Sequence, residues 1–117
     1  MSSPFPTIGI LGGGQLGKMM AAEAVRMSVD VRLLSPKEAG PMQPYADTQV
    51  GDWTDPDVLR PFTADCDVVT VESEWAPADA AAEVLPDDTA LWPSTKTLSL
   101  IKDKGVQKQH LAEAGCP

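Results

Sequence analysis

The feature that most constrains the fold of this chain is a glycine-rich loop between two apolar segments. Thr7–Leu11 is short, apolar and rich in β-branched residues, which predicts a buried strand. Gly12-Gly13-Gly14-Gln15-Leu16-Gly17 follows at once, and apolar residues then recur at helical spacing as far as Met27. A second apolar run covers Val29–Leu34. Strand, glycine turn, helix and strand in this order predict a βαβ unit.

The rest of the chain continues to alternate. A loop is expected over 37–47, and Asp55-Pro56 has the pattern of a helix start, with an aspartate cap before a proline. The further expected elements are strands at Thr48–Val50, Val68–Val71 and Ala90–Trp92, and helices from Pro56 to Phe62, from Pro77 to Leu85, after the Ser94 cap, and from Asp103 to Ala114. This order predicts an α/β fold, a Rossmann-like open parallel sheet flanked by helices.

Length and charge exclude several classes of partner. A chain of 117 residues is predicted to form a single domain. Its net charge of -8 argues against nucleic acid, which is bound through clustered lysine and arginine. No apolar stretch approaches the ~20 residues of a membrane helix, so no membrane partner is expected. Cys66 and Cys116 form no disulfide framework or metal-ligand pattern, which favours the reducing cytoplasm.

The glycine loop is the first candidate binding site. Gly12, Gly14 and Gly17 match G-x-G-x-x-G between a strand and a helix, the context that the motif requires. Without a Cβ, the main chain can approach a phosphate, and the free N–H groups of the helix start attract it. The alternative is a tight turn that only brings helix and strand close together.

Ser35 decides between two kinds of ligand. A site for NAD uses an acidic residue at the end of the second strand, and here Ser35 stands in that place. Ser35 with Lys37 would suit the extra phosphate of NADP instead. An NADP-binding domain of a reductase therefore remains a second hypothesis.

Glu72 and Glu74 form the other candidate site. They follow the strand Val68–Val71 and project the same way if the strand continues, or ring a loop if it ends. At the carboxyl end of a parallel strand they could accept hydrogen bonds from a ligand; the alternative is a solvated loop before the next helix. His110 is expected to be solvated. Trp53, Trp75 and Trp92 are expected to pack, and Met19 and Met20 to belong to the core and the helix surface.

Gly12-Gly13-Gly14-Gln15-Leu16-Gly17-Lys18-Met19 resembles the opening of the N5-carboxyaminoimidazole ribonucleotide synthetases. Further similarities follow in the family's order, from residue 7 to the end. They are Ala46-Asp47, Gly51-Asp52-Trp53, Cys66-Asp67-Val68-Val69-Thr70, Glu72 with Glu74, Pro93-Ser94, Asp103-Lys104 and Gly115-Cys116-Pro117. The chain departs from the family at Val71, Ser73 and Trp75, and at Ser35, where an aspartate is common.

The resemblance implies a pre-ATP-grasp domain that holds the substrate of a carbon–nitrogen ligase in purine biosynthesis. That ligase uses ATP and bicarbonate to form carboxyphosphate and then carboxylates the amine of aminoimidazole ribonucleotide. Gly13, Gly14, Gln15 and Leu16 would meet the ribose phosphate, and Gln15, Glu72 and Glu74 the ribose or the aminoimidazole. ATP and Mg would be bound mainly by ATP-grasp domains after residue 117, so no catalytic residue is expected here and the chain alone would be inactive.

The resemblance also implies a core over about 7–93, linker helices over 94–117, and a homodimer, since family members are often dimers. Three alternatives remain open. They are the NADP-binding domain, a free-standing binding module, and the first domain of another ATP-grasp ligase, such as glycinamide ribonucleotide transformylase or biotin carboxylase.

Overall fold

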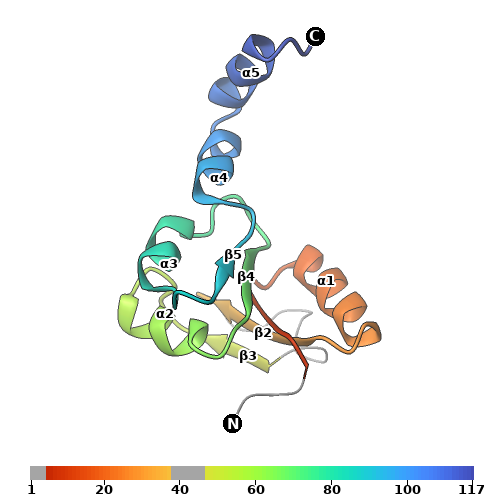
Figure 1. The fold of residues 1–117 in the computed structure, drawn as a ribbon, viewed down its shortest axis with the longest axis vertical. Coiled ribbons are helices and arrows are strands. Elements are labelled where there is room, and N and C mark those ends of the chain that lie inside the picture. The colour runs from red at the N-terminus through yellow and green to blue at the C-terminus, as the bar shows by residue number, and fades with distance from the viewer. Residues whose placement is uncertain (1–4, 38–46) are drawn as a thin grey trace.

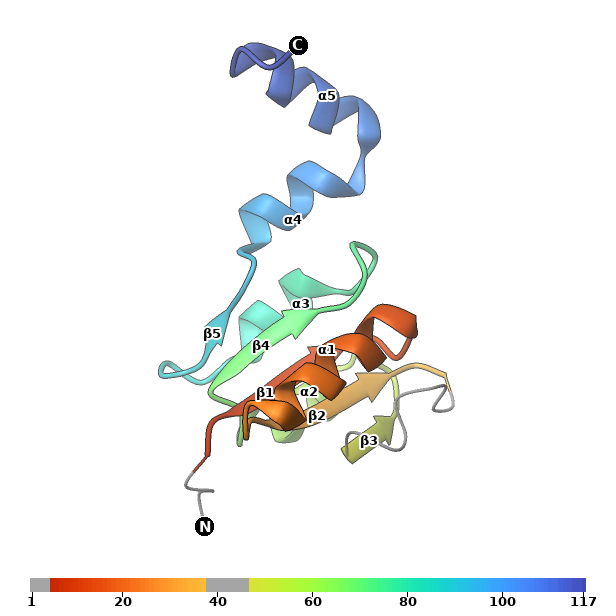
Figure 2. The ribbon, with the colours of Figure 1, turned by 90° about the vertical axis from the view of Figure 1, so that its right-hand side faces the viewer.

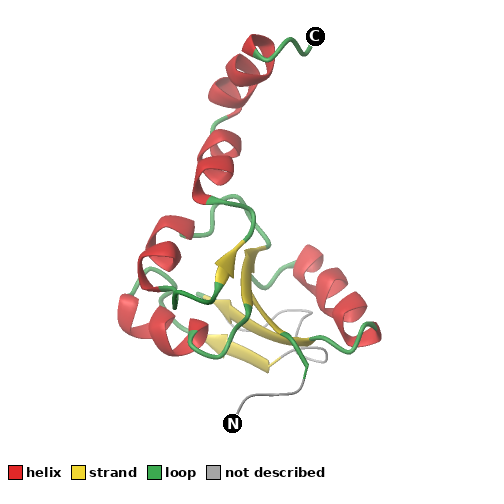
Figure 3. Cartoon of the chain, in the orientation of Figure 1, coloured by secondary structure: helices red, strands yellow, loops and turns green. Residues whose placement is uncertain are grey.

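The computed structural model describes residues 5–37 and 47–117. Strands and helices alternate along most of this length, as Figure 3 shows. Their bounds are β1 (Thr7–Leu11), α1 (Gln15–Arg26), β2 (Asp30–Ser35), β3 (Asp47–Val50), α2 (Pro56–Thr63), β4 (Val68–Val71), α3 (Ala78–Val84), β5 (Ala90–Leu91), α4 (Thr95–Lys102) and α5 (Lys104–Glu113). The predicted elements are confirmed, with ends that differ by one or two residues. Of the expected loop over 37–47, residues 38–46 lie outside the described part, as does Ala46 of the family resemblance.

The strands form one parallel sheet of five, in the order β3-β2-β1-β4-β5. In the central pairs, Leu11 lies opposite Leu34 of β2 on one side and Val71 of β4 on the other. After β1, the strands β2 and β3 are added on one side of β1, and β4 and β5 are then added on its other side. The strand order therefore reverses between β1 and β4, and we call the carboxyl ends of these two strands the switch point. The predicted α/β class with an open parallel sheet is confirmed.

Helices cover both faces of the sheet, with α1 on one side and α2 and α3 on the other (Figure 1). The α2–α3 side holds the larger apolar cluster, which includes the fully buried Leu59 and Phe62. The α1 side holds a smaller one, in which Ala21 and Ala24 pack on Ile10, Val31 and Leu33. Burial of this apolar surface supplies the main driving force for the fold.

The side of α1 that faces the sheet consists of small residues. Gly17, Ala21 and Ala24 are its buried positions. Met19 and Met20 are 57% and 38% exposed, so the expectation that these methionines include a core residue is wrong. Without large side chains between them, α1 lies close to β1 and β2, and its larger apolar residues remain on the surface.

Two of the three tryptophans also differ from expectation. Trp53 packs against the larger cluster, as predicted. Trp75 and Trp92 are 70% and 62% exposed, so packing is the wrong prediction for both. Each lies in or beside a turn that follows a strand, where the chain leaves the sheet and no helix covers the side chain. Within the described ranges, no helix has the length and hydropathy needed to cross a membrane.

The last two helices extend away from the sheet. Figures 1 and 2 show α4 and then α5 leading outward from the end of β5. Ser94 caps α4 and Asp103 caps α5, each accepting hydrogen bonds from main-chain amides of the first turn. Leu98 of α4 is buried, whereas α5 has no buried residue. Gly115, with φ of 89°, follows the end of α5 in the left-handed conformation typical of a helix stop.

Candidate functional site

The glycine loop joins β1 to α1 at the switch point. Gly12 has φ of 130°, a conformation that side chains disfavour, and its N–H donates to the Leu34 carbonyl at 2.9 Å. Gly14 is the N-cap residue of α1 and makes no side-chain cap. The loop therefore presents the start of α1 at the carboxyl edge of the sheet, where ligands of open α/β folds bind.

The first turn of α1 differs from those of the other helices. Among the described helices, it alone has neither a capping side chain nor an acidic residue there; α2, α4 and α5 are capped, and α3 carries Asp79. The first amides of a helix have no partner within the helix. Gln15 and Leu16 are exposed residues of this first turn, and the start of a helix is a place where anions bind.

Glu72 contacts the glycine loop directly. The strand β4 ends at Val71, and the Glu72 amide donates to the Leu11 carbonyl at 3.0 Å, which fixes the residue beside β1. A Cβ on Gly12 would lie 2.8 Å from the Glu72 Cβ, and one on Gly14 would overlap the carboxylate oxygen Oε1. The structure thus brings together the glycine loop and one of the two predicted carboxylates. No described side chain or amide donates a hydrogen bond to the Glu72 carboxylate.

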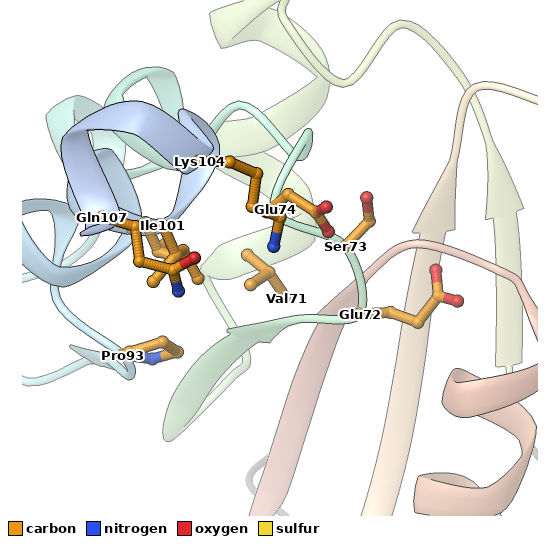
Figure 4. Close-up of a pocket in the computed structure, with 9 residues that line it drawn as sticks. Val71, Glu72, Ser73, Glu74, Pro93, Ile101, Lys104 and Gln107 are labelled. Carbon is orange, nitrogen blue, oxygen red and sulfur yellow. The ribbon is translucent and has the colours of Figure 1, made fainter. Parts of the chain in front are cut away.

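Glu74 has different surroundings. Because the chain turns after Val71, the two glutamates do not share one strand face. In Figure 4 the Glu72 side chain extends toward β1 and α1, whereas Glu74 lies on the side of Lys104 and Gln107 from α5. None of the atoms nearest to the loop glycines belongs to Glu74.

A cavity of ≈ 360 Å³ lies between the turn after β4 and the last two helices (Figure 4). This volume is in the range of small-molecule sites. Its wall combines apolar and polar groups: Val71, Glu72, Ser73, Glu74, Pro93, Leu98, Ile101, Lys104 and Gln107. Glu72 belongs both to this wall and to the contact with the glycine loop, so the loop and the cavity adjoin.

Sequence reasoning missed Lys104 and Gln107 as site residues. They lie about thirty positions after Glu72, and only the fold of α4 and α5 carries them back toward β4. The motif at Asp103-Lys104 indicated a helix start, and that start is confirmed. Nothing in the local pattern indicates that the same turn faces a cavity.

Ser35 does not line an open surface. It is 7% exposed, its hydroxyl accepts from the Lys37 amide at 3.3 Å, and its Cβ and Oγ would each lie 3.3 Å from a Cβ on Gly13. The hydroxyl thus closes a turn at the end of β2, and the Ser35 side chain packs next to Gly13 of the glycine loop. This position does not favour a role in holding the additional phosphate of NADP.

The sequence matches the family model of the ribonucleotide synthetase preATP-grasp domain over residues 5–102. The chain belongs to this family. It is 40% identical over 113 residues to a phosphoribosylaminoimidazole carboxylase of Ogataea methanolica, covering 93% of this chain and 21% of that protein. It is 37% identical to an N5-carboxyaminoimidazole ribonucleotide synthase of Brucella melitensis, covering 96% of this chain and 31% of that protein. The preATP-grasp chain therefore spans between a fifth and a third of the length of these curated relatives.

Solved structures of the family share the fold. A synthetase from Thermus thermophilus superposes with a TM-score of 0.83 and 33% identity, over 94% of this chain and 30% of that one. A synthase from Aspergillus clavatus, in complex with ADP and 5-aminoimidazole ribonucleotide, gives 0.82 and 32% over 97% of this chain and 30% of that one. The expected pre-ATP-grasp family is thereby confirmed, and these relatives are ATP-dependent ligases of purine biosynthesis.

The residues that the structure describes do not fit a metal site. In the part of the chain that the structure describes, no three histidine, cysteine, aspartate or glutamate side chains come together as a metal ion would require. Glu72 and Glu74 point apart, so they do not form a pair of oxygen ligands such as Mg²⁺ prefers.

Proposed function

We propose that this chain is the substrate-binding domain of an ATP-grasp ligase that carboxylates 5-aminoimidazole ribonucleotide with ATP and bicarbonate. The observation that carries the proposal is the contact of Glu72 with the glycine loop at the switch point, in a chain that belongs to the preATP-grasp family. The Aspergillus clavatus relative, which was solved with ADP and this ribonucleotide, supports the choice of substrate.

The ribose phosphate is assigned to the first turn of α1. The amides near Gly13, Gly14, Gln15 and Leu16 would donate to the phosphate, and the helix dipole would add to the attraction. Among the described residues, no side chain caps the first turn of α1, so a phosphate bound there would displace no cap.

The carboxylate of Glu72 is assigned to hydrogen-bond donors of the sugar or the base. Glu72 lies beside the glycine loop and on the cavity wall. Its carboxylate would therefore contact the ligand between the ligand's phosphate and the ligand's other end. Glu74 and the Gln15 side chain would contact the more distant groups. The cavity leads on toward Lys104, a basic residue of its wall.

Phosphoryl transfer from ATP would supply the activation of bicarbonate. The groups that hold ATP and Mg are assigned to ATP-grasp domains following residue 117, and 94–117 to the linker that leads to them. On this division residues 7–93 bind and orient the ribonucleotide, and no residue of the chain is catalytic. The cytoplasm and a homodimer are the expected setting, as for a soluble enzyme of nucleotide synthesis.

The test is ATP hydrolysis by the full-length protein that contains this chain. Aminoimidazole ribonucleotide is expected to stimulate hydrolysis in the presence of bicarbonate, while glycinamide ribonucleotide is the matched control. Stimulation by glycinamide ribonucleotide alone would assign the chain to a related ligase. Equal rates with and without either compound would contradict the proposal.

A further inference from the structure

We propose that Glu72 restricts this site to ligands with a single phosphate group, by placing a negative charge where the diphosphate of a dinucleotide would lie. The inference rests on the proposed function in one respect, namely that the glycine loop binds a phosphorylated ligand. It goes further, because it explains why a loop with a dinucleotide-type glycine pattern would accept a ribonucleotide.

The topology places Glu72 at the crossing point of a dinucleotide. In doubly wound folds the diphosphate lies over the first glycine loop, and the two halves of the ligand spread to either side of the point where strand order reverses. Here that point lies between β1 and β4. Glu72 is the first residue after β4, and its amide is tied to Leu11, the last residue of β1.

The glycines make room for this side chain. Gly12 is buried, and a Cβ there would overlap the Glu72 side chain, including its carboxylate oxygen Oε2. A Cβ on Gly14 would overlap the other oxygen. Part of the space that missing Cβ atoms normally leave for a diphosphate is therefore filled by a carboxylate of the protein.

The negative charge of Glu72 disfavours a diphosphate, as does the space that its side chain fills. A diphosphate drawn along the loop from Gln15 toward Gly12 would bring its second phosphate against the Glu72 carboxylate. A single phosphate can stay at the amides of Gln15 and Leu16 and leave the carboxylate free to accept hydrogen bonds from hydroxyl or amino groups. No described residue donates to the Glu72 carboxylate, and a carboxylate can accept several hydrogen bonds from such a ligand.

The test compares inorganic pyrophosphate with ribose 5-phosphate as probes of the 117-residue chain, by amide NMR shifts of the glycine loop. Glu72→Gln removes the charge and keeps the shape. It is expected to raise the affinity for pyrophosphate roughly tenfold, the effect of removing a like charge a few ångströms away. The gain should shrink as salt rises, because screening weakens the repulsion that the variant removes. Ribose 5-phosphate should bind the variant no more than about twofold more tightly, since it loses an acceptor as it loses the repulsion.

Glu83→Gln is the matched control, because Glu83 is an exposed residue of α3 and its loss changes the net charge equally. Glu72→Ala provides a second variant with the same expected gain. The inference is overturned if neither Glu72 variant binds pyrophosphate more tightly than the wild type, or if Glu83→Gln gains as much. Failure of the proposed function gives a different result: aminoimidazole ribonucleotide then leaves the loop amides of the wild type unshifted, whatever pyrophosphate does.

Discussion

The sheet and the C-terminal helices contribute to the site in different ways. At the switch point, Glu72 rests on glycines of the sheet's own first loop, and its amide donates to the Leu11 carbonyl of β1. Two residues later, Glu74 faces a cavity whose far wall is Lys104 and Gln107 of α5, a helix with no buried residue. One part of the site is therefore fixed by the core of the fold, whereas the other depends on α5, which buries no side chain.

The two free cysteines give the largest expected contrast between these regions. Cys66 is 5% exposed in the larger apolar cluster, and burial raises the pKa of its thiol to about 11, whereas Cys116 is exposed beyond α5. With iodoacetamide at neutral pH, we expect Cys116 to react at least about 100-fold faster than Cys66, because reaction needs an accessible thiolate. Mass spectrometry of timed samples measures both rates. Comparable rates would show that the sheet opens as readily as the extension.

The same thiol predicts a pH dependence. Its pKa is higher in the folded chain than in the unfolded one, so the free energy of unfolding keeps this contribution below the ordinary value of 9.0 and loses it as the pH rises toward about 11. Urea unfolding at several alkaline pH values measures the loss. In Cys66→Ala the part of the slope that comes from this group should disappear.

Gly12→Ala tests the part of the site that the sheet fixes. The variant must adopt φ of 130° and overlap Glu72, so we expect a loss of about 3 kcal/mol in the free energy of unfolding. Gly13→Ala is the control. A Cβ on Gly13 would lie 3.3 Å from the Cβ and Oγ of Ser35, and the φ of Gly13 is not positive. Urea unfolding of both variants decides; equal losses would mean that the contact with Glu72 is not special.

The contact between Gly14 and Glu72 is tested by a double-mutant cycle. Gly14→Ala should cost about 1–2 kcal/mol, and the same change in a Glu72→Ala background should cost much less, since the overlapping carboxylate is gone. The coupling energy comes from urea unfolding of the four proteins. Additive losses would show that the glycine loop and Glu72 are not energetically coupled, and would remove the structural basis of the proposed site.

Removal of residues 103–117 should have the smallest effect. Because α5 buries no side chain, we expect the free energy of unfolding to fall by less than about 0.5 kcal/mol, as for changes at ordinary surface positions. The shortened chain still contains the family match over 5–102, but it lacks Lys104 and Gln107. A loss of several kcal/mol would show that the extension is part of the cooperative fold.

The sequence predicted the elements well because their ends carry strong local signals. Asp55 before Pro56 and Ser94 before Thr95 are caps in the structure, as expected, and the glycine loop joins β1 to α1. The sequence did not predict which side of α1 faces the sheet. Its apolar residues occupy more than one side of the helix. The side that packs on the sheet carries the small residues Gly17, Ala21 and Ala24, because close approach of helix and sheet matters more there than hydrophobicity.

The candidate site was predictable in its parts but not in its arrangement. Glu72 and Glu74 were correctly placed after a strand, but the alternation of a strand could not show that the chain turns at Glu72 and separates the two side chains. The contribution of α5 depends on packing between segments far apart in the sequence. No periodicity within either segment encodes that contact.

A crystal of this chain soaked with aminoimidazole ribonucleotide tests the central claim most directly. The account predicts the ligand's phosphate within hydrogen-bonding distance of the amides of Gln15 and Leu16, with the Glu72 carboxylate next to its sugar or base. Density for the ligand at another surface, with those amides still facing solvent, would contradict it.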